Sequence, residues 1–219
     1  DKAMLDAIDR NTKIIFICNP NNPTGTYWDR DRVIRFLEAV DNRQIVVMDE
    51  AYFEFVEKED YPDCMSLIPR YPNLVVFRTF SKMYGLAGLR IGYLAGNLDV
   101  VNTIRKTCVV YSVNSIAQEA AIAAMDDTGH IQRTRRLVAE GKEFLRRELT
   151  RMGLFYVAGE GNFMMIKLPI SDTLAYRKLM NHGIMVRTMT GFRFPGFIRV
   201  TISELPVMEA FIHALRKIL

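Results

Sequence analysis

The stretch VVFRTFSKMYGLAGLRIGYLAG, residues 75–96, connects two apolar runs through a short polar segment that holds one lysine, Lys82. Its opening run, VVF, is apolar and contains β-branched residues, which is typical of a buried strand. Lys82 follows where that strand should end, and glycines come after it at positions 85, 88 and 92. An isolated lysine would most simply lie in a surface turn, because lysine is rarely buried. The polar residues elsewhere in the chain decide between that interpretation and a chemical role.

The first half of the chain alternates strand and helix patterns. Strands are predicted at 13–18, 44–50, 73–80 and 91–96, and helices at 28–40, where Asp29 could cap the N-terminus, and near 63–70. This alternation is typical of an α/β fold with a mostly parallel sheet and helices on both faces. The 13–18 run reads as a fully buried strand that needs neighbours on both sides. The link before 91–96 is too short for a helical crossover, so that strand is expected to run antiparallel.

The second half predicts a small α+β domain. Helices near 98–110 and 114–126 precede a long helix at about 130–152, in which Val138, Gly141, Leu145, Leu149 and Met152 recur at helical spacing. A hairpin at 153–169, a helix at 172–183, short strands at 184–187 and 196–202 and a closing helix at 205–219 should follow. The predicted domains are a partial large domain (1–128), a bridging helix (129–152) and a small C-terminal domain (153–219). The chain is expected to be the C-terminal portion of a longer protein.

Composition excludes several classes of function. The 219 residues carry 29 basic and 25 acidic side chains, and a net charge of +4 is too weak to imply a nucleic-acid partner. Acidic small molecules would suit that charge equally well. The long helix has a basic face, but acidic residues interrupt it, so a solvated face is favoured over an interaction module that binds nucleic acid.

Cysteine and histidine positions give no metal or disulfide pattern. The three cysteines and three histidines are far apart, without a C-x-x-C sequence or the spacing of metal ligands. No apolar run is as long as a membrane span, and no signal peptide opens the sequence. We therefore expect no metal, no membrane association, reduced thiols and a cytoplasmic protein.

Three polar clusters follow the first three predicted strands: NPNNPTG at 19–25, DEAY at 49–52 and TFSK at 79–82. Each alone has a structural explanation, such as a proline-fixed turn or a helix cap. The GLAGLRIG sequence lacks the G-x-G-x-x-G spacing and precedes a strand, which argues against a dinucleotide loop. In an open parallel sheet, however, ligands bind outside the carboxyl ends of the strands, so all three clusters should meet in one crevice.

The residue types in these clusters suit pyridoxal 5'-phosphate. This cofactor needs a lysine amine for its aldehyde and a carboxylate at its pyridine nitrogen, which makes the ring an electron sink. It also needs hydrogen-bond donors at its phenolic oxygen, and cations and hydroxyls at its phosphate.

The motifs NPNNPTG, DEAY and TFSKMYGLAGLRIGY strongly resemble those of the fold-type-I pyridoxal-phosphate-dependent aminotransferases (class I/II). Within that group the chain is most similar to the histidinol-phosphate aminotransferases, and GIMVRTMTGFRFPGFIRVTI supports the same subgroup. The resemblance extends over residues 1–219. The sequence does not include the N-terminal region that in the family supplies a glycine-rich phosphate loop and the aromatic residue stacked on the cofactor ring.

The resemblance implies a role for each motif residue. Lys82 would be the catalytic residue, which binds the cofactor covalently and moves the proton, and Asp49 would pair with the pyridine nitrogen. The remaining cofactor ligands would be Asn22 and Tyr52 at the phenolic oxygen, and Thr79, Ser81 and Arg90 at the phosphate.

Two arginines are the predicted substrate-binding residues. Arg199 lies in the otherwise apolar strand FIRVTI, where a buried guanidinium would be costly without a partner. By resemblance Arg199 binds the anionic group of the substrate, and Arg187 is a second candidate. A guanidinium forms paired hydrogen bonds with either a carboxylate or a phosphate, so one site could serve both substrates.

The activity implied is transamination of L-histidinol phosphate with 2-oxoglutarate, a step of histidine biosynthesis, in a homodimer with the active site at its interface. An aromatic amino-acid aminotransferase or a threonine-phosphate decarboxylase would use the same Lys82 and Asp49. A non-catalytic pyridoxal-phosphate-binding domain of a transcription regulator is the alternative outside enzymes.

Overall fold

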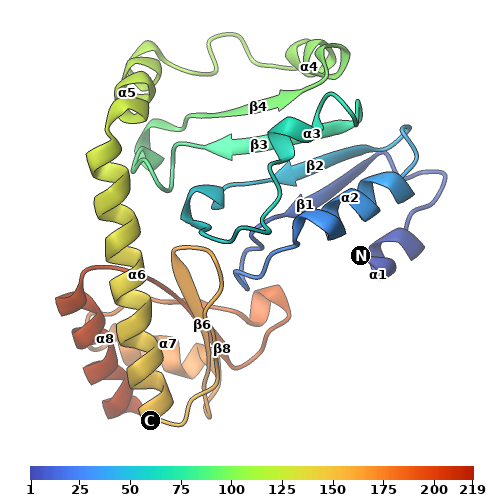
Figure 1. The fold of residues 1–219 in the computed structure, drawn as a ribbon. Helices are drawn as coiled ribbons and strands as arrows, with labels where there is room; N and C mark the ends of the chain where they lie inside the picture. The colour runs from blue at the N-terminus through green and yellow to red at the C-terminus, as the bar shows by residue number, and fades with distance from the viewer. The chain divides into compact units, whose positions relative to one another are not determined.

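The computed structural model describes residues 1–219 and divides into two compact units, each built around its own four-stranded sheet (Figure 1). The first unit comprises Asp1–Asn21 and Tyr27–Thr128. The second unit comprises Asn22–Thr26 and Gly129–Leu219. A five-residue segment, Asn22–Thr26, thus belongs to the second unit although the residues on both sides of it belong to the first.

The sheet of the first unit has the order β1-β2-β3-β4. Its strands are β1 (Ile14–Cys18), β2 (Ile45–Asp49), β3 (Leu74–Thr79) and β4 (Gly92–Gly96). The pairs β1–β2 and β2–β3 are parallel, whereas β4 runs antiparallel to β3. The four predicted strands and the antiparallel direction of the last are therefore confirmed.

The helices of the first unit are α1 (Lys2–Asp6), α2 (Arg30–Ala39), α3 (Cys64–Leu67), α4 (Leu98–Arg105) and α5 (Ser115–Asp126). Asp29 caps α2 as predicted, because its carboxylate accepts a hydrogen bond from the backbone N–H of Arg32 at 2.8 Å. Helix α4 ends at Arg105, five residues before the predicted end at 110. The following β-branched residues, at 107, 109 and 110, have lower helix propensity, which accounts for the earlier end.

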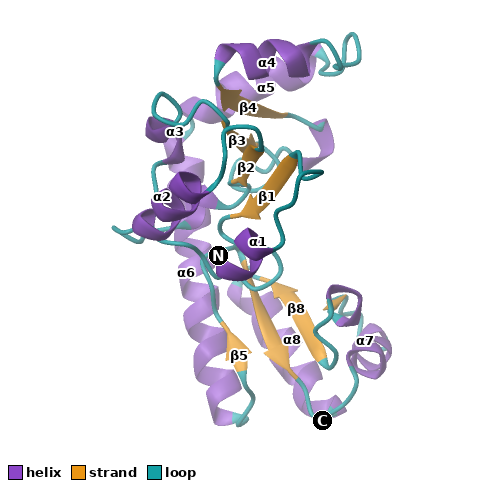
Figure 2. Ribbon diagram, turned by 90° about the vertical axis from the view of Figure 1, so that its right-hand side faces the viewer, coloured by secondary structure: helices purple, strands orange, loops and turns teal.

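The core of the first unit lies between its sheet and α2. The buried side of α2, with Val33, Phe36 and Leu37, packs with β-strand residues such as Met48 and Val76. Helices α2 and α3 lie beside one face of the sheet (Figure 2), and α4 contacts β4. Burying such side chains contributes about 1.5–3 kcal/mol each, so this interface holds the strand ends in place.

Strand β1 differs from the prediction. It lies at an edge of the sheet, and its side chains alternate between buried and exposed, with Ile14 53% and Phe16 60% exposed. The prediction of a fully buried strand with neighbours on both sides is wrong for this structure. An all-apolar run reads the same at an edge as at the centre of a sheet, which explains the error.

The second unit combines an antiparallel sheet, of order β5-β6-β8-β7, with three helices. Its elements are α6 (Thr128–Arg151), β5 (Tyr156–Val157), β6 (Phe163–Lys167), α7 (Asp172–Met180), β7 (Arg187–Thr188), β8 (Phe197–Thr201) and α8 (Leu205–Ile218). Helix α7 ends before the predicted Gly183, which instead adopts a left-handed turn with φ +72°. The predicted strand at 184–187 is reduced to β7.

Helix α6 buries the predicted residues Val138, Leu145 and Leu149. Two charged residues assigned to its solvated face are buried as well, Lys142 at 9% and Glu148 at 7% exposure. Lys142 Nζ donates a hydrogen bond to the backbone carbonyl of Gly159 at 2.5 Å. The face of α6 that carries these two residues therefore packs within the second unit, which the mixed charge pattern did not indicate.

Glu148 binds three arginines, and one of them, Arg216, connects α6 to α8. Its carboxylate accepts hydrogen bonds from Arg216 at 2.5 Å, from Arg151 at 2.7 Å and from Arg147 at 3.3 Å. Burial acts to raise the pKa of Glu148, but the hydrogen bond from Arg147 and the charges of the three guanidinium groups outweigh it and lower that pKa below its ordinary value.

We predict that Glu148→Gln lowers the melting temperature at neutral pH and that the difference shrinks as the pH falls. The lowered pKa means that the charged carboxylate stabilises the fold above the unfolded-state value of about 4.5, and that this stabilisation is lost as the pH falls through the folded-state pKa. Thermal unfolding from pH 7 to pH 3 measures the effect, with the exposed Glu143→Gln as a control. A difference in melting temperature that did not change with pH would contradict this account.

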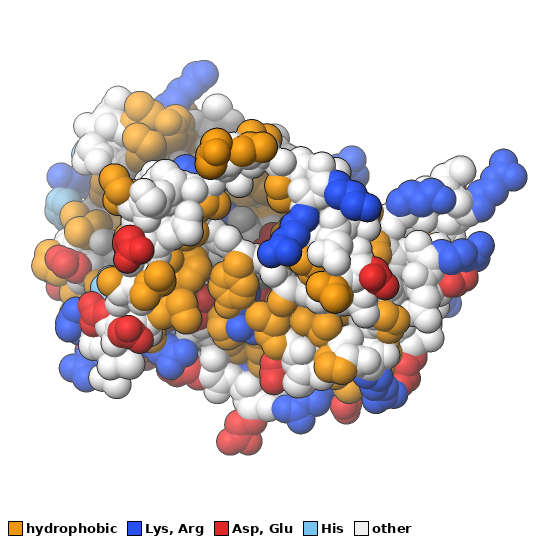
Figure 3. Space-filling view, turned by 90° about the horizontal axis from the view of Figure 1, so that it is seen from above, with side chains coloured by type: hydrophobic (Ala, Val, Ile, Leu, Met, Phe, Trp, Pro, Cys, Tyr) orange, Lys and Arg blue, Asp and Glu red, His pale blue; other side chains and the backbone are white.

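Exposed apolar side chains gather around α4 and α5, where they interrupt the charged surface seen from above (Figure 3). Within this region the largest exposed fractions belong to Leu98, Val109, Val110, Tyr111 and Ile116. None of the helices combines the length and the apolar character that a membrane span requires. We refer to the surface formed by these five exposed residues, Leu98, Val109, Val110, Tyr111 and Ile116, as the α4–α5 patch.

Candidate functional site

A cavity of about 350 Å³ in the first unit lies at the carboxyl ends of β2 and β3. Its lining comprises Asp49, Ala51, Phe77, Arg78, Thr79, Ser81, Lys82, Ala87 and Arg90. Five of these are predicted site residues: Asp49, Thr79, Ser81, Lys82 and Arg90. The structure therefore brings together an amine, a carboxylate, a guanidinium and two hydroxyl groups around one cavity.

Asp49 is positioned by the sheet. It is the last residue of β2 and pairs with Phe77 of β3, so its carboxylate lies where the strand ends. The carboxylate accepts a hydrogen bond from the backbone N–H of Ala51 at 3.1 Å, and the thiol of Cys18 lies 3.9 Å from its other oxygen. Because the side chain is only half-buried, one face of the carboxylate stays available to a ligand.

The loop after β3 turns back on itself and places Arg90 beside Lys82. The backbone N–H of Gly85 donates to the carbonyl of Lys82 at 3.2 Å, with Gly85 at φ +70°. Arg90 itself has a left-handed conformation, φ 56°, and its guanidinium donates to the carbonyl of Ala87 at 2.8 Å. A positive φ is uncommon for arginine and tends to occur at functional sites. The turn therefore depends on the unusual backbone conformation of Arg90 as well as on the conformational freedom of Gly85.

Tyr52 lies next to the lysine. Its ring is buried, and Lys82 Nζ lies 5.5 Å from the ring centroid. The cluster DEAY therefore contributes both its aspartate and its tyrosine to the surroundings of Lys82.

A buried ion pair, which the sequence analysis did not predict, connects the ends of β2 and β3. Glu50 is fully buried and accepts hydrogen bonds from the Arg78 guanidinium at 2.9 and 2.8 Å. The guanidinium lies 3.5 Å from the centroid of the Phe53 ring. Burial raises the pKa of Glu50, and the positive charge of Arg78 opposes that change. The only signal for this pair in the sequence was the opposite charge of the residue after Asp49 and of the residue before Thr79.

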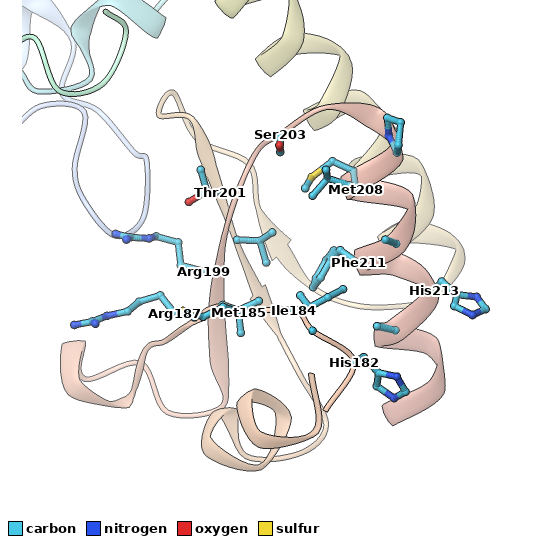
Figure 4. Close-up of a pocket in the computed structure, with 17 residues that line it drawn as sticks. His182, Ile184, Met185, Arg187, Arg199, Thr201, Ser203, Met208, Phe211 and His213 are labelled. Atoms are coloured by element: carbon cyan, nitrogen blue, oxygen red, sulfur yellow. The ribbon is translucent and has the colours of Figure 1, made fainter. Parts of the chain in front are cut away.

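The other predicted residues meet in the second unit. The Arg199 guanidinium donates a hydrogen bond to the side-chain oxygen of Asn22. Arg187 of β7 pairs with Arg199 in the sheet, and the two side chains extend to the same side (Figure 4). Both residues also line a cavity of about 660 Å³ whose remaining lining is mostly apolar side chains of α8 and residues 184–186, but their side chains extend away from α8 (Figure 4). Two guanidinium groups and one amide thus form a site suited to an anion.

Asn22 is held in the second unit by a contact between two glycines. Gly25 has φ +73°, and a Cβ atom added to Gly159 would lie 2.2 Å from the carbonyl carbon of Gly25. The backbone N–H of Glu160 donates to the carbonyl of Gly25 at 2.7 Å, and Lys142 binds the carbonyl of Gly159. Only glycine permits so close an approach, which explains why the segment Asn22–Thr26 belongs to this unit.

The first asparagine of NPNNPTG has a structural role instead. Asn19 is fully buried, and its side-chain amide forms two hydrogen bonds with the backbone of Trp28, at 2.7 and 3.1 Å. The Tyr61 hydroxyl donates to the Asn19 carbonyl at 2.5 Å. Both Asn-Pro bonds of the motif are cis. Asn19 therefore closes the loop, while Asn22 is left to face Arg199.

We predict that Gly159→Ala destabilises the second unit by about 1–3 kcal/mol, the usual cost of overpacking, because the new methyl group must displace the backbone of Gly25. Hydrogen exchange at the Glu160 amide should accelerate, since its bond to the Gly25 carbonyl would lengthen. Gly191→Ala is a matched control, because a Cβ atom there meets no other atom within 4 Å. Equal exchange rates in the two variants would contradict the proposed contact.

The fold and the first cavity define a class of protein. A mixed sheet with a lysine, a carboxylate and anion-binding groups at its carboxyl edge is the arrangement expected of a fold-type-I pyridoxal-phosphate enzyme. The family described as aminotransferase class I and II matches residues 2–215, and the chain belongs to that family.

Curated relatives narrow the comparison. The chain is 43% identical over 220 residues to histidinol-phosphate aminotransferase 2 of Carboxydothermus hydrogenoformans, covering 100% of this chain and 60% of the relative. It is 40% identical over 218 residues to histidinol-phosphate aminotransferase 1 of Nitrosococcus oceani, covering 100% and 59%. The chain thus spans about three-fifths of the length of these relatives.

Solved structures confirm the predicted fold class. The histidinol-phosphate aminotransferase of Sinorhizobium meliloti, in complex with pyridoxal-5'-phosphate, superposes with a TM-score of 0.88 at 30% identity, covering 99% of this chain and 60% of the other. The L-threonine-O-3-phosphate decarboxylase of Porphyromonas gingivalis superposes with a TM-score of 0.83 at 24% identity, covering 97% and 66%, and shows the shared fold alone. The family and the Sinorhizobium complex agree with pyridoxal phosphate as the cofactor.

Proposed function

We propose that this chain is the catalytic portion of a pyridoxal-phosphate-dependent aminotransferase that acts on L-histidinol phosphate and 2-oxoglutarate. The observation that carries the proposal is the cavity at the ends of β2 and β3, where Lys82 and Asp49 lie with three anion-binding side chains. The relatives named above, which are histidinol-phosphate aminotransferases, support the choice of amino donor.

The donor set of the cavity fits pyridoxal phosphate. The cofactor, when bound, supplies an electron sink for chemistry at the α-carbon of an amino acid. Arg90, Thr79 and Ser81 would hold its phosphate, since a guanidinium and hydroxyls are strong donors to phosphate oxygens. Asp49 would keep a proton on the pyridine nitrogen by placing a negative charge beside it. Asn22 and Tyr52 would donate to the phenolic oxygen.

Lys82 performs the proton transfer in this proposal. Its side chain is exposed to the cavity, so the amine would be free to hold the cofactor and to carry a proton to and from the α-carbon of the substrate. The ring of Tyr52 limits the directions in which the flexible side chain can extend. The Glu50–Arg78 pair supports this arrangement by joining the strands on which Asp49 and Thr79 lie.

Arg187 and Arg199 would bind the anionic group of each substrate in turn. Each guanidinium can form paired hydrogen bonds with the phosphate of histidinol phosphate or with a carboxylate of 2-oxoglutarate. No observation in the structure favours an aromatic amino acid or threonine phosphate over histidinol phosphate. Rates of amino transfer from these donors to 2-oxoglutarate therefore decide the substrate, and a faster reaction with an aromatic donor would overturn the assignment.

We propose further that the protein is cytoplasmic and that it forms a homodimer. The α4–α5 patch supports the dimer, because exposed apolar surface commonly marks protein interfaces. Sedimentation of the purified protein measures its oligomeric state. A monomer at micromolar concentration would contradict the dimer.

Covalent labelling tests the cofactor site. We predict that incubation with pyridoxal phosphate and reduction with borohydride adds one cofactor to the intact mass, and that the labelled peptide contains Lys82. Lys82→Ala should remove the adduct, whereas Lys106→Ala, outside the cavity, should keep it. Equal labelling of the Lys82→Ala variant, or an adduct spread over several surface lysines, would overturn the proposal.

A further inference from the structure

A buried carboxylate in the second unit has no role in the reaction described above. Asp172, the first residue of α7, is 2% exposed. Its two oxygens accept hydrogen bonds from the backbone N–H groups of Met189 at 2.9 Å, Thr190 at 2.8 Å and Gly196 at 3.3 Å, and from the Thr190 hydroxyl at 2.7 Å. A carboxylate is almost never buried to this extent unless its charge is compensated. Here the donors come from one loop.

Helix capping does not account for these contacts. The N-cap of α7 is Ser171, whose hydroxyl accepts a hydrogen bond from the Leu174 N–H at 3.2 Å. An aspartate at the first position of a helix ordinarily stabilises that helix, because its negative charge lies close to the free backbone N–H groups of the first turn. All four hydrogen bonds given above run instead to residues 189–196. Burial acts to raise the pKa of Asp172, but the Thr190 and backbone hydrogen bonds outweigh it and lower that pKa.

The loop that Asp172 closes connects the two substrate-binding arginines. Arg187 lies two residues before Met189, and Arg199 lies three residues after Gly196. The carboxylate thus binds both ends of the connection between β7 and β8, where Arg187 and Arg199 are paired. β7 is only two residues long, so few ladder hydrogen bonds hold Arg187 in place. Lys167, from β6, supports the same loop by donating to the Pro195 carbonyl at 2.8 Å.

We propose that Asp172 is a positioning residue that holds Arg187 and Arg199 at the spacing required by a bound phosphate or carboxylate group. The inference rests on the proposed role of the two arginines. A guanidinium pair binds an anion well only when its geometry is preorganised, because otherwise binding must also order the loop. Loss of the Asp172 contacts should therefore weaken substrate binding without changing the chemistry at Lys82.

The test compares Asp172→Asn with Ser171→Ala in the full-length enzyme saturated with pyridoxal phosphate. The asparagine keeps the size of the side chain but replaces one acceptor oxygen with a donor. We expect KM for the anionic substrate and the dissociation constant for inorganic phosphate, measured by calorimetry, to rise about tenfold or more, with kcat within about twofold. Thr190→Val, which loses one of the hydrogen bonds, should have a smaller effect of the same kind.

The controls separate positioning from stability. Ser171→Ala should lower the melting temperature by removing the cap of α7 but leave phosphate affinity unchanged. Arg199→Gln should abolish phosphate binding if the arginines form the site. The inference is overturned if Asp172→Asn binds phosphate as the wild type does, or if Arg199→Gln does not affect binding. If Asp172→Asn weakens phosphate binding and Arg199→Gln abolishes it, but histidinol phosphate is not a substrate, then the positioning role stands and the proposed substrate is wrong.

Discussion

The parallel pairing of β2 with β3 is the constraint on which the cavity around Lys82 depends. It places Asp49 opposite Phe77, so that the side chains after both strands open at one edge of the sheet. Packing of α2 against one face of the sheet fixes the register of these strands, because a shift by one residue would turn their apolar side chains away from the core. The Glu50–Arg78 pair adds a second connection between the same strands. The geometry of the cavity around Lys82 thus depends on helix packing and on an ion pair that both hold this edge of the sheet.

The second unit uses a different means to build an anion site. Its arginines come from an antiparallel pair with one very short strand. The connecting loop is ordered by hydrogen bonds to a carboxylate as well as by the buried side chain of Met189. Backbone amides that point at one buried charge hold a loop firmly at small cost in side-chain volume.

Much of the fold and of the first cavity could be predicted, since strand ends and polar clusters are both local features of a sequence. Asp49 ends β2, and Lys82 and Arg90 lie in the loop after the adjacent parallel strand β3, so the three meet at one edge of the sheet. Other features depend on neighbours that no local pattern identifies. The periodicity of α6 marked its apolar face but could not show that Lys142 reaches the Gly159 carbonyl. Asn19 and Asn22 are the same residue type in one motif, and only their contacts distinguish the amide that closes the loop from the amide that faces Arg199.

The glycine contact between positions 25 and 159 makes the two units interleaved along the chain. The polypeptide leaves the first unit after Asn21, returns to it at Tyr27 and leaves it again after Thr128. A fragment that began at Gly129 would retain the antiparallel sheet and both arginines, yet it would lack the amide that faces Arg199. The anion site is therefore not a property of the C-terminal segment alone, and an exchange of that segment between related enzymes would have to carry residues 22–26 with it.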